Sequence, residues 1–429
     1  MSGEASYRAR SVKGMRDLLP PETAVWNAVE ATAREVFGRY GFEEIRTPVV
    51  EETELFVRGV GGATDIVGKE MYTFADKKGK SLTLRPENTA PVARAYAQHQ
   101  LASRPQPLRL YYIGPQFRYE RPQKGRYRQF YQIGAEILGD EGPWTDAEVV
   151  VMLVRFLEAL GFEDLDVLIN TVGDRESRER YRERLVGFLS PLADELGEDS
   201  RRRLDTNPLR ILDTKSPREI ELLADAPRLR DSLNDASRAH FDEFCSALGA
   251  CDVSFRLDDR LVRGLDYYTR TVFEIQSGRL GAQSALVGGG RYDGLVEEVG
   301  GPPTPGIGFA IGLDRLVECL PERSELTVTT RPSFAVVRLG EVSMLDAIGL
   351  SEELRLDGLE VIAELSGSLR SALRRADRRG SAYAILFGDD ELAAGKLTVK
   401  RFEDGYQIEV RREGAAQALR DALGLENPS

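Results

Sequence analysis

Residues 117–136, FRYERPQKGRYRQFYQIGAE, constrain the fold more than any other stretch of the chain. They predict two β-strands joined by a basic loop, in which alternate side chains share a face. The residues predicted to share that face are Tyr112, Gly114, Gln116, Arg118 and Glu120 on the first strand and Arg128, Phe130, Gln132, Gly134 and Glu136 on the second. Charged and amide groups are costly to bury without a partner. The pattern therefore predicts a small charged ligand on the sheet and a polyanion at the loop.

The composition narrows the class of protein. A chain of 429 residues suffices for two or three domains. It has no apolar run long enough for a membrane span, and the first residues lack the apolar stretch of a signal peptide. Cys245, Cys251 and Cys319 have no metal-ligand spacing and suit a reducing cytoplasm. Two histidines nearly exclude a histidine-based triad or zinc site, and a net charge of −12 confines nucleic-acid contacts to local patches.

Periodicity predicts the order of elements. An apolar stripe predicts a helix over 22–40, and residues 42–56 predict one strand that Pro48 would place at an edge or interface. A strand then turns into a helix near Thr89, the hairpin strands follow, and a helix covers 146–160. Residues 170–250 are charged and helical. From 330 onward, apolar strands alternate with helices and a hairpin follows, which predicts a small α/β domain with a mixed sheet.

Two segments combine strand patterning with polar side chains that could bind a ligand. Glu87 lies where a strand becomes a helix. There it could bind an ammonium group, or it could only interact favourably with the helix dipole. On the hairpin, Arg118 can grip a phosphate or carboxylate, and Gln132 and Glu136 can fix an amine and a polar ring. A solvated surface hairpin is the alternative, which the flanking aromatic residues weaken.

Three more segments follow in the second half of the chain. Arg263 with Tyr267 and Tyr268 could stabilise a phosphoryl group and enclose a small ring, or could be an ordinary strand. Residues 288–294, GGGRYDG, fit a glycine-lined pocket wall better than a phosphate loop, with a simple loop as the alternative. Arg315 lies in the first turn of a helix, where a positive charge is unfavourable for the helix dipole. This position suggests that Arg315 binds a negative ligand. The alternative is a structural partner such as Asp314.

Taken together, these segments resemble class II aminoacyl-tRNA synthetases, and among them the histidyl-tRNA synthetases. Residues 41–56 look like the first motif of the class, 117–136 like the second and 306–316 like the third. Residues 262–274 and 289–301 are similar to the two histidine-specific signatures. The resemblance implies an α+β fold with an antiparallel sheet flanked by helices. It divides the chain into catalytic parts at 1–169 and 253–325, a helical insertion at 170–252 and an anticodon-binding α/β domain at 330–429.

The resemblance also implies roles for single residues. Arg263 would be catalytic at the α-phosphate of ATP, with Arg118, Arg315 and Gly312 binding the nucleotide. Arg121 and Gln123 would approach the acceptor end of the tRNA. The residues implied to bind histidine are Glu87, Asn88, Thr89, Gln132, Glu136, Tyr267, Tyr268 and Tyr292.

The implied function is a histidine–tRNA ligase that forms histidyl-adenylate and then charges tRNA(His). Its expected partners are ATP, L-histidine, tRNA(His) and a second copy of the chain, and Mg²⁺ would bind the ATP phosphates with no metal site of the protein's own. The chain departs from the family pattern at Asn88 and at Asp314, where an Asp replaces the usual Glu.

The sequence is also compatible with two rival functions. The first is the inactive regulatory subunit of ATP phosphoribosyltransferase, which should lack the complete hairpin loop and the anticodon domain. The second is a non-enzymatic RNA-binding module, which would need no ATP site. Five arginines at 370, 374, 375, 378 and 379 share one predicted helix, which is either a solvated face or faces RNA.

Overall fold

The computed structural model describes residues 8–62, 64–122, 125–262, 267–278, 285–321 and 333–425. The chain divides into two compact units, Met1–Thr327 and Val328–Ser429. Arg263 and Gln123, to which the family resemblance gives roles in catalysis and tRNA contact, lie outside the described residues. None of the helices in the described ranges combines the length and the apolar character that a bilayer crossing requires.

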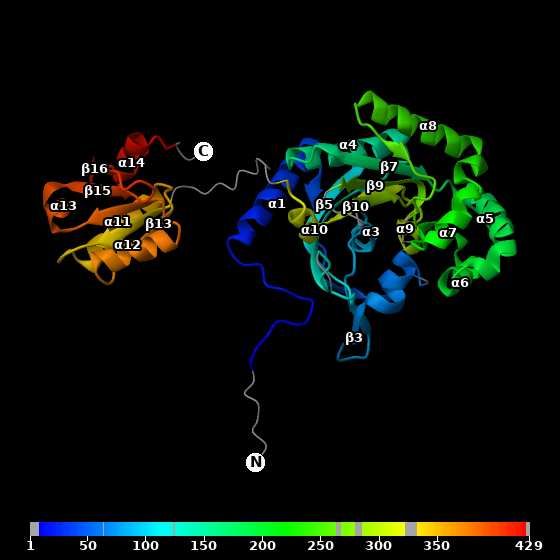
Figure 1. The fold of residues 1–429 in the computed structure, drawn as a ribbon, viewed down its shortest axis with the longest axis horizontal. Helices are drawn as coiled ribbons and strands as arrows, with labels where there is room; N and C mark the ends of the chain where they lie inside the picture. Colours follow the sequence, from blue (N-terminus) through cyan, green and yellow to red (C-terminus); the bar gives the residue numbers. More distant parts are fainter. Residues whose placement is uncertain are drawn as a thin grey trace, which may run out of the picture. The chain divides into compact units, whose positions relative to one another are not determined.

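An eight-stranded sheet organises the first unit (Figure 1). In spatial order its strands are β1 (Glu43–Glu44), β5 (Leu108–Phe117), β6 (Gln129–Leu138), β11 (Gly306–Gly312), β10 (Ala285–Arg291), β9 (Thr269–Ser277), β7 (Leu165–Thr171) and β8 (Arg256–Leu257). Neighbouring inner strands are antiparallel, and β1 and β8 lie parallel to their neighbours at the edges. The predicted antiparallel sheet flanked by helices is therefore confirmed.

The predicted hairpin is formed by β5 and β6, with Tyr112 opposite Gly134 and Gly114 opposite Gln132. Odd-numbered residues such as Ile133 and Phe309 face an apolar core. Helices that contribute to this core are α1 (Glu22–Arg39), α4 (Pro143–Ala159) and α8 (Asp235–Ala250). The even-numbered, polar face lies on the other side of the sheet, towards α3 (Thr89–Gln98) (Figure 1). The core thus fixes the sheet from one side and leaves the opposite face for a site.

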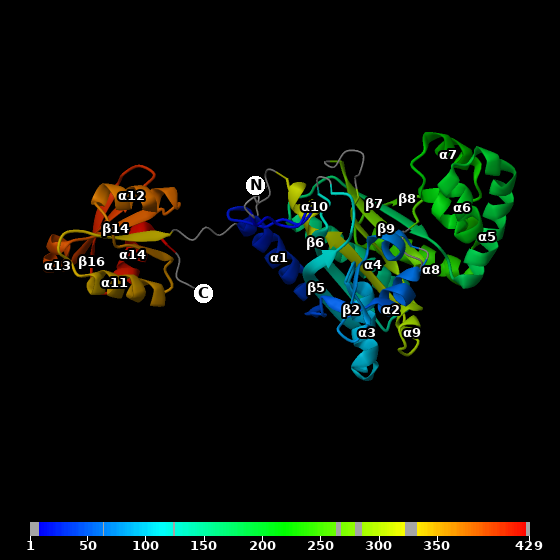
Figure 2. The same ribbon diagram turned by 90° about the horizontal axis from the view of Figure 1, so that it is seen from below.

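The charged segment after β7 is helical, as the sequence predicts. It contains α5 (Arg175–Leu189), α6 (Glu198–Thr206) and α7 (Pro217–Leu222), which Figure 2 shows gathered beside β7 and β8. Asp174 caps α5 by accepting a hydrogen bond from the backbone N–H of Ser177, and Asn234 caps α8 through Ser237 in the same way. Apolar residues of these helices join the second core cluster, which also includes Tyr267 and Tyr268.

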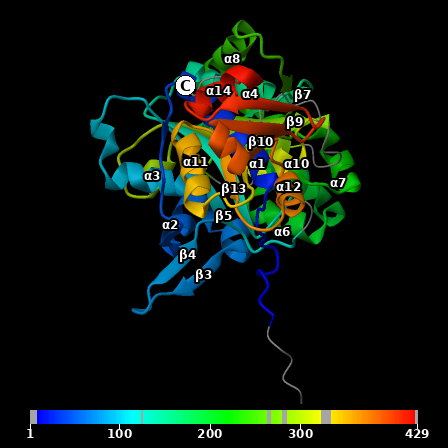
Figure 3. The same cartoon turned by 90° about the vertical axis from the view of Figure 1, so that its left-hand side faces the viewer.

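The single strand predicted over 42–56 is wrong. The segment forms β1, then β2 (Val50–Glu52) in a different sheet, then α2 (Thr53–Phe56). Pro48 lies between the two strands and has no N–H to continue a ladder. Strand β2 pairs with β4 (Ser81–Leu84), which also pairs with β3 (Tyr72–Ala75), and Figure 3 shows β3 and β4 projecting from the first unit. The remaining helices of this unit are α9 (Leu295–Glu298) and α10 (Leu313–Glu318).

The second unit has the predicted mixed sheet. In spatial order its strands are β13 (Val361–Glu364), β12 (Phe334–Arg338), β14 (Tyr383–Phe387), β15 (Lys396–Arg401) and β16 (Gln407–Arg411). The first three are parallel, and β14, β15 and β16 are antiparallel. Its helices are α11 (Met344–Leu356), α12 (Leu369–Arg378), α13 (Asp389–Ala394) and α14 (Ala415–Leu423), of which the sequence did not predict α13.

Candidate active site

Two adjoining cavities lie on the polar face of the large sheet. The smaller encloses about 170 Å³ and the larger about 420 Å³. Arg118, Gln132, Gly288 and Ala310 line both cavities. The polar sheet face that the sequence predicts therefore lines a real cavity, and Arg118 and Gln132 stand at the junction of its two halves.

Glycines clear the sheet face for these side chains. A Cβ on Gly308 would lie 1.7 Å from Oε2 of Glu136, and one on Gly134 would lie 2.3 Å from the hydroxyl of Tyr112. Real atoms cannot approach so closely, so both positions require glycine. The triple glycine of residues 288–290 belongs to strand β10, paired with β9 and β11, and is not a loop. The pocket-wall interpretation holds for Gly288.

Glu136 lies directly behind the lining of the smaller cavity and has no exposed surface. Its carboxylate accepts hydrogen bonds from the hydroxyls of Thr89 (2.8 Å), Tyr112 (3.2 Å) and Tyr292. Burial raises the pKa of Glu136 to about 8, although the hydrogen bonds from Tyr292 and Thr89 act in the other direction. A basic ligand in the cavity would favour its ionised form.

Glu87 caps a helix and also faces the smaller cavity. Its carboxylate accepts hydrogen bonds from the backbone N–H groups of Thr89 (2.8 Å) and Ala90 (3.0 Å) at the start of α3. Burial raises the pKa of Glu87, and these backbone hydrogen bonds oppose the shift. The structural and the ligand-binding interpretations of Glu87 are compatible, since the capping acid lines the cavity.

Three tyrosines form an aromatic wall of the smaller cavity. The ring centroids of Tyr267 and Tyr268 lie 4.8 Å apart, and those of Tyr267 and Tyr292 lie 5.7 Å apart, edge to face. Burial raises the pKa of Tyr267 and Tyr292, so both hydroxyls stay neutral donors. Beside them, Oε1 of Gln132 is buried and accepts no hydrogen bond from the described residues. The wall can enclose a small flat ring, and Gln132 offers it an acceptor.

Two arginines dominate the larger cavity. Arg118 donates from Nε to the backbone carbonyl of Pro86 (2.9 Å), and its guanidinium lies over the ring of Phe130, 5.3 Å from the centroid. Burial, and then the neighbouring Arg126, lower the pKa of Arg315. A negative ligand beside Arg315 would offset this repulsion, while Glu120 already lies 3.9 Å from Arg118 and 3.7 Å from Arg126. Gly312 lines the same cavity.

Asn88 and Arg121 are not brought to these cavities. The side-chain carbonyl of Asn88 accepts a hydrogen bond from the hydroxyl of Thr47 (2.7 Å), and Asn88 lines a separate hollow with Thr47 and Arg85. Arg121 is exposed on the loop between β5 and β6. Every other predicted site residue within the described ranges lines one of the two cavities or, like Glu136, bonds to a residue that does.

Sequence reasoning assigned no role to several residues that line the larger cavity. They are Glu70, Glu120, Tyr127, Phe130 and Glu274. Period-two alternation already places Phe130 and Glu120 on the right face, so their position was predictable. Glu70 follows β2 and α2 in the chain and reaches the cavity only through tertiary packing, for which the sequence carries no local signal.

Asp314 has a structural role at this site. Its Oδ2 accepts a hydrogen bond from the backbone N–H of Tyr131 (3.0 Å), and its Oδ1 pairs with Arg16 (3.2 Å). The shorter acid at this position therefore still ties α10 to β6, directly beside Arg315.

Comparison with known proteins gives a consistent result. A family model described as "Histidyl-tRNA synthetase" matches residues 14–316, and one described as "Anticodon binding domain" matches residues 333–422. The chain is 49% identical over 419 residues to a histidine–tRNA ligase of Geobacillus kaustophilus, covering 96% of this chain and 98% of the relative. It is 48% identical over 413 residues to a histidine–tRNA ligase of Nitrosomonas europaea, with the same coverage.

Solved structures agree with the sequence relatives. Apo histidyl-tRNA synthetase of S. aureus superposes with a TM-score of 0.81 at 36% identity, covering 96% of this chain and 99% of the other. An ATP phosphoribosyltransferase regulatory subunit/histidyl-tRNA synthetase from Bacillus halodurans gives a lower TM-score of 0.65 at 25% identity, over 90% of this chain and 99% of the other.

Proposed function

The chain belongs to the histidyl-tRNA synthetase family, and from this premise we propose that the two adjoining cavities bind its amino acid and its nucleotide. It is an aminoacyl-tRNA ligase: it activates L-histidine with ATP to histidyl-adenylate and pyrophosphate, then transfers histidine to the 3′ end of tRNA(His). One observation carries the assignment of the cavities. Arg118 and Gln132 line both halves, so two ligands bound there would meet between them.

Histidine fits the smaller cavity. Its volume of about 170 Å³ suits an amino acid and not a nucleotide. Glu87, Glu136, Thr89 and Gln132 supply acids and acceptors for the ammonium group and the imidazole N–H, and the tyrosines enclose the ring. Asn88 does not face this cavity. Its hydrogen bond to Thr47 fixes the residue directly before α3 and so positions Thr89 indirectly.

ATP fits the larger cavity, whose volume of about 420 Å³ lies in the range of small-molecule sites. Arg118 and Arg315 would hold the phosphates, and Phe130 offers an aromatic face to the base. Gly312, at the end of β11, keeps the wall free of a side chain.

The chemistry requires two anions to approach each other. A carboxylate oxygen of histidine forms a bond to the α-phosphorus while the bond from that phosphorus to the bridging oxygen breaks, and pyrophosphate leaves with the electron pair. Fixed cations offset the repulsion and stabilise charge in the transition state. We assign this role to Arg118 and Arg315 and, from the family pattern, to Arg263 at the α-phosphate.

Mg²⁺ fits the same site as a companion of ATP. No three acidic, His or Cys side chains of the described residues converge on one point, so the phosphates of ATP would supply most of the ligands, with a single carboxylate of the larger cavity (Glu70, Glu120 or Glu274) beside them. When bound, the ion would neutralise charge on the β- and γ-phosphates.

Transfer RNA would meet both units. Exposed Arg121, with Gln123 beside it in sequence, suits the acceptor end near the larger cavity. In the second unit, α12 exposes Arg370, Arg374 and Arg378 at intervals of four residues, along one face of the helix. Arg375 and Arg379 instead pair with the buried carboxylate of Glu364, at 2.7 and 2.8 Å. The helix thus separates arginines that hold the fold from arginines available to phosphates.

We further propose a cytoplasmic homodimer with the division into domains that the sequence predicts. Residues 41–56 correspond to the segment that forms the dimer contact in the family. A hollow of about 680 Å³ lies along it, lined in part by Pro48, Leu55 and Val299. Light scattering of the purified protein gives the oligomeric state.

Neither rival function accounts for the chain as well. A regulatory subunit without catalysis has no need for the arginines of the larger cavity, and it should lack an anticodon domain, which residues 333–422 match. The same arginines argue against a module that only binds RNA.

Exchange of labelled pyrophosphate into ATP tests the proposal. The exchange should depend on added histidine, and Arg118→Ala or Arg315→Ala should lower its rate by about 10²-fold or more. Arg263→Ala should lower the rate while leaving histidine binding mostly intact. No histidine-dependent exchange by well-folded protein would overturn the assignment.

A further inference from the structure

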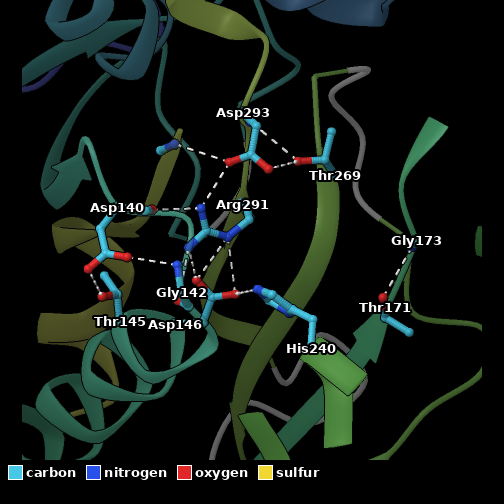
Figure 4. A network of polar contacts seen from close by, with 11 residues as sticks. Asp140, Gly142, Thr145, Asp146, Thr171, Gly173, His240, Thr269, Arg291 and Asp293 are labelled. Atoms are coloured by element: carbon cyan, nitrogen blue, oxygen red, sulfur yellow. Dashed lines mark hydrogen bonds and ion pairs between the residues drawn. The ribbon is translucent and has the colours of Figure 1, made fainter. Parts of the chain in front are cut away.

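Arg291 is a fully buried arginine at the end of β10, directly before the pocket residue Tyr292. All five of its N–H groups have acceptors. Nε and Nη2 donate to the carboxylate of Asp146, Nη1 donates to Asp293 (2.9 Å), and the backbone carbonyls of Asp140 (2.9 Å) and Gly142 (3.2 Å) take the remaining two (Figure 4). Contacts with α4 and with the turn before α4 therefore fix the position of the Arg291 guanidinium.

The residues that follow Arg291 connect this cluster to the smaller cavity. Tyr292 donates a hydrogen bond from its hydroxyl to Glu136, and its backbone N–H donates to the carbonyl of Gly306 (2.7 Å). Asp293 accepts hydrogen bonds from Thr269 (3.3 Å) and from the N–H of Gly306 (3.3 Å) (Figure 4). Three consecutive residues thus join α4, on one side of the sheet, to strands β9 and β11 and to Glu136, which faces the other side.

Neighbouring carboxylates offset the positive charge of Arg291. Asp146 has no exposed surface, and Nε2 of His240 lies 3.6 Å from its Oδ2. Burial, and then the charge of Arg291, lower the pKa of His240 to about 4, so this ring is neutral at physiological pH. Arg291 is therefore balanced by Asp146 and by the partly exposed Asp293.

Stability alone does not explain a buried ion pair. Removing two charges from water costs so much that well-packed apolar side chains in the same place are often equally stable or better. What the pair does provide is a fixed geometry, because a guanidinium with five acceptors has one orientation. That geometry reaches Tyr292, the next residue along the chain.

We propose that Arg291 and Asp146 are positioning residues for histidine binding: they hold the Tyr292 hydroxyl against Glu136. The inference rests on the proposed function, which places histidine in the smaller cavity. Neither side chain lines that cavity. They act only through Tyr292 and the backbone of Gly306.

The test compares Michaelis constants in the pyrophosphate exchange assay. Arg291→Met combined with Asp146→Leu removes both fully buried charges together, and the partly exposed Asp293 keeps its hydrogen bonds from Thr269 and Gly306. We expect the melting temperature to stay close to wild type, KM for histidine to rise about ten-fold or more, and KM for ATP to change less than about two-fold, since small misplacements weaken substrate contacts. Unchanged KM for histidine, or equal rises for both substrates, would overturn the proposal.

A cycle with Tyr292→Phe separates positioning from a merely structural role. If the pair acts through Tyr292, adding Tyr292→Phe to the double variant should raise KM for histidine little further, although it raises KM strongly in the wild-type background. Independent, multiplicative effects would refute the proposal. Should the double variant fail to fold, Arg291→Lys is tested instead, because it keeps the positive charge but loses the bidentate geometry of the guanidinium. The proposal then predicts a higher KM for histidine and a nearly unchanged KM for ATP. If Tyr292→Phe and Glu136→Gln both leave KM for histidine unchanged in active enzyme, the assignment of the cavity itself has failed.

Discussion

Thr89 donates a hydrogen bond to Glu136, with 2.8 Å between Oγ1 and Oε1, and so joins the first residue of α3 to the C-terminal part of β6. The two residues are 47 positions apart in the chain. The contact places the start of a helix against a sheet strand at the base of the smaller cavity, and it keeps the carboxylate in a water-poor environment. The acid is thus held in place before any ligand arrives.

We predict that this environment makes the stability of the protein depend on pH through Glu136. Its pKa of about 8 lies above the value of 4.5 for a free glutamate, so the folded state holds a proton that the unfolded state has lost between these values. Stability should therefore fall as pH rises from about 4.5 through 8. Glu136→Gln removes this titration, so the variant should gain stability relative to wild type as pH rises.

Denaturant unfolding of both proteins at several pH values measures the difference. The pH interval from 6.5 to 8 is the most informative. In the folded state Asp146 has a pKa of about 6 and His240 a pKa of about 4, so both groups have largely titrated below this interval. Parallel stability profiles for the two proteins would contradict the prediction.

A second prediction concerns Gly308→Ala. The new methyl group would overlap Glu136, whose Oε2 is 1.7 Å away, and the backbone carbonyl of Ala135 at 2.6 Å. Since the backbone of a central strand cannot withdraw, we expect a loss of about 1–3 kcal/mol or more in the free energy of unfolding and at least a ten-fold rise in KM for histidine.

Gly187→Ala is the matched control for this change. Gly187 lies in α5 and a Cβ there would meet no atom within 4 Å. The substitution should stabilise the helix by about 0.5–1 kcal/mol and leave KM for histidine unchanged. Normal histidine binding by Gly308→Ala would show that the cavity floor is more adaptable than its contacts indicate.

The hairpin shows how far the sequence can lead. Alternation alone placed Arg118, Gln132 and Glu136 on one face, because a strand has a strict period of two. The same rule failed at 42–56, where Pro48 divides the segment between two sheets. Local pattern could not show that the flanking strands pair with different partners, since pairing is decided by distant residues.

The site was predictable in its parts but not in its connections. Glu136 and Tyr292 were both expected near histidine, yet their hydrogen bond depends on the register of β6, β11 and β10. Arg291 looked like a residue of a glycine-rich wall. Its burial against Asp146, 145 positions earlier, follows from tertiary packing that no local motif records.

A third prediction arises from Gln116 on β5. This residue has no exposed surface, and neither its Oε1 nor its Nε2 finds a hydrogen-bond partner within the described ranges. An unsatisfied buried amide costs about 1–3 kcal/mol. Gln116→Met, which keeps the length of the side chain, should therefore raise the free energy of unfolding by about 1 kcal/mol. Exposed Gln98→Met should not, and a destabilised Gln116→Met would indicate that the amide has a partner such as bound water.

The fourth prediction concerns the exposed arginines of α12. Replacing Arg370, Arg374 and Arg378 by Gln should raise KM for tRNA several-fold in the charging reaction. It should leave pyrophosphate exchange unchanged, because adenylate formation needs no tRNA. Each phosphate contact contributes about 0.7–0.9 to the slope of log affinity against log salt concentration, so three lost contacts should flatten that slope by about 2.

The control must remove the same charge from another surface of the second unit. Lys396, Arg401 and Arg411 lie on β15 and β16, and changing these three to Gln alters the net charge equally. If the α12 residues contact phosphates directly, only their variant changes the salt slope, because diffuse attraction responds to net charge whereas counterion release responds to contacts. Equal effects of the two triple variants would leave α12 as a solvated face. Arg375 and Arg379 are kept in both variants, since unpairing the buried carboxylate of Glu364 would confuse lost binding with lost stability.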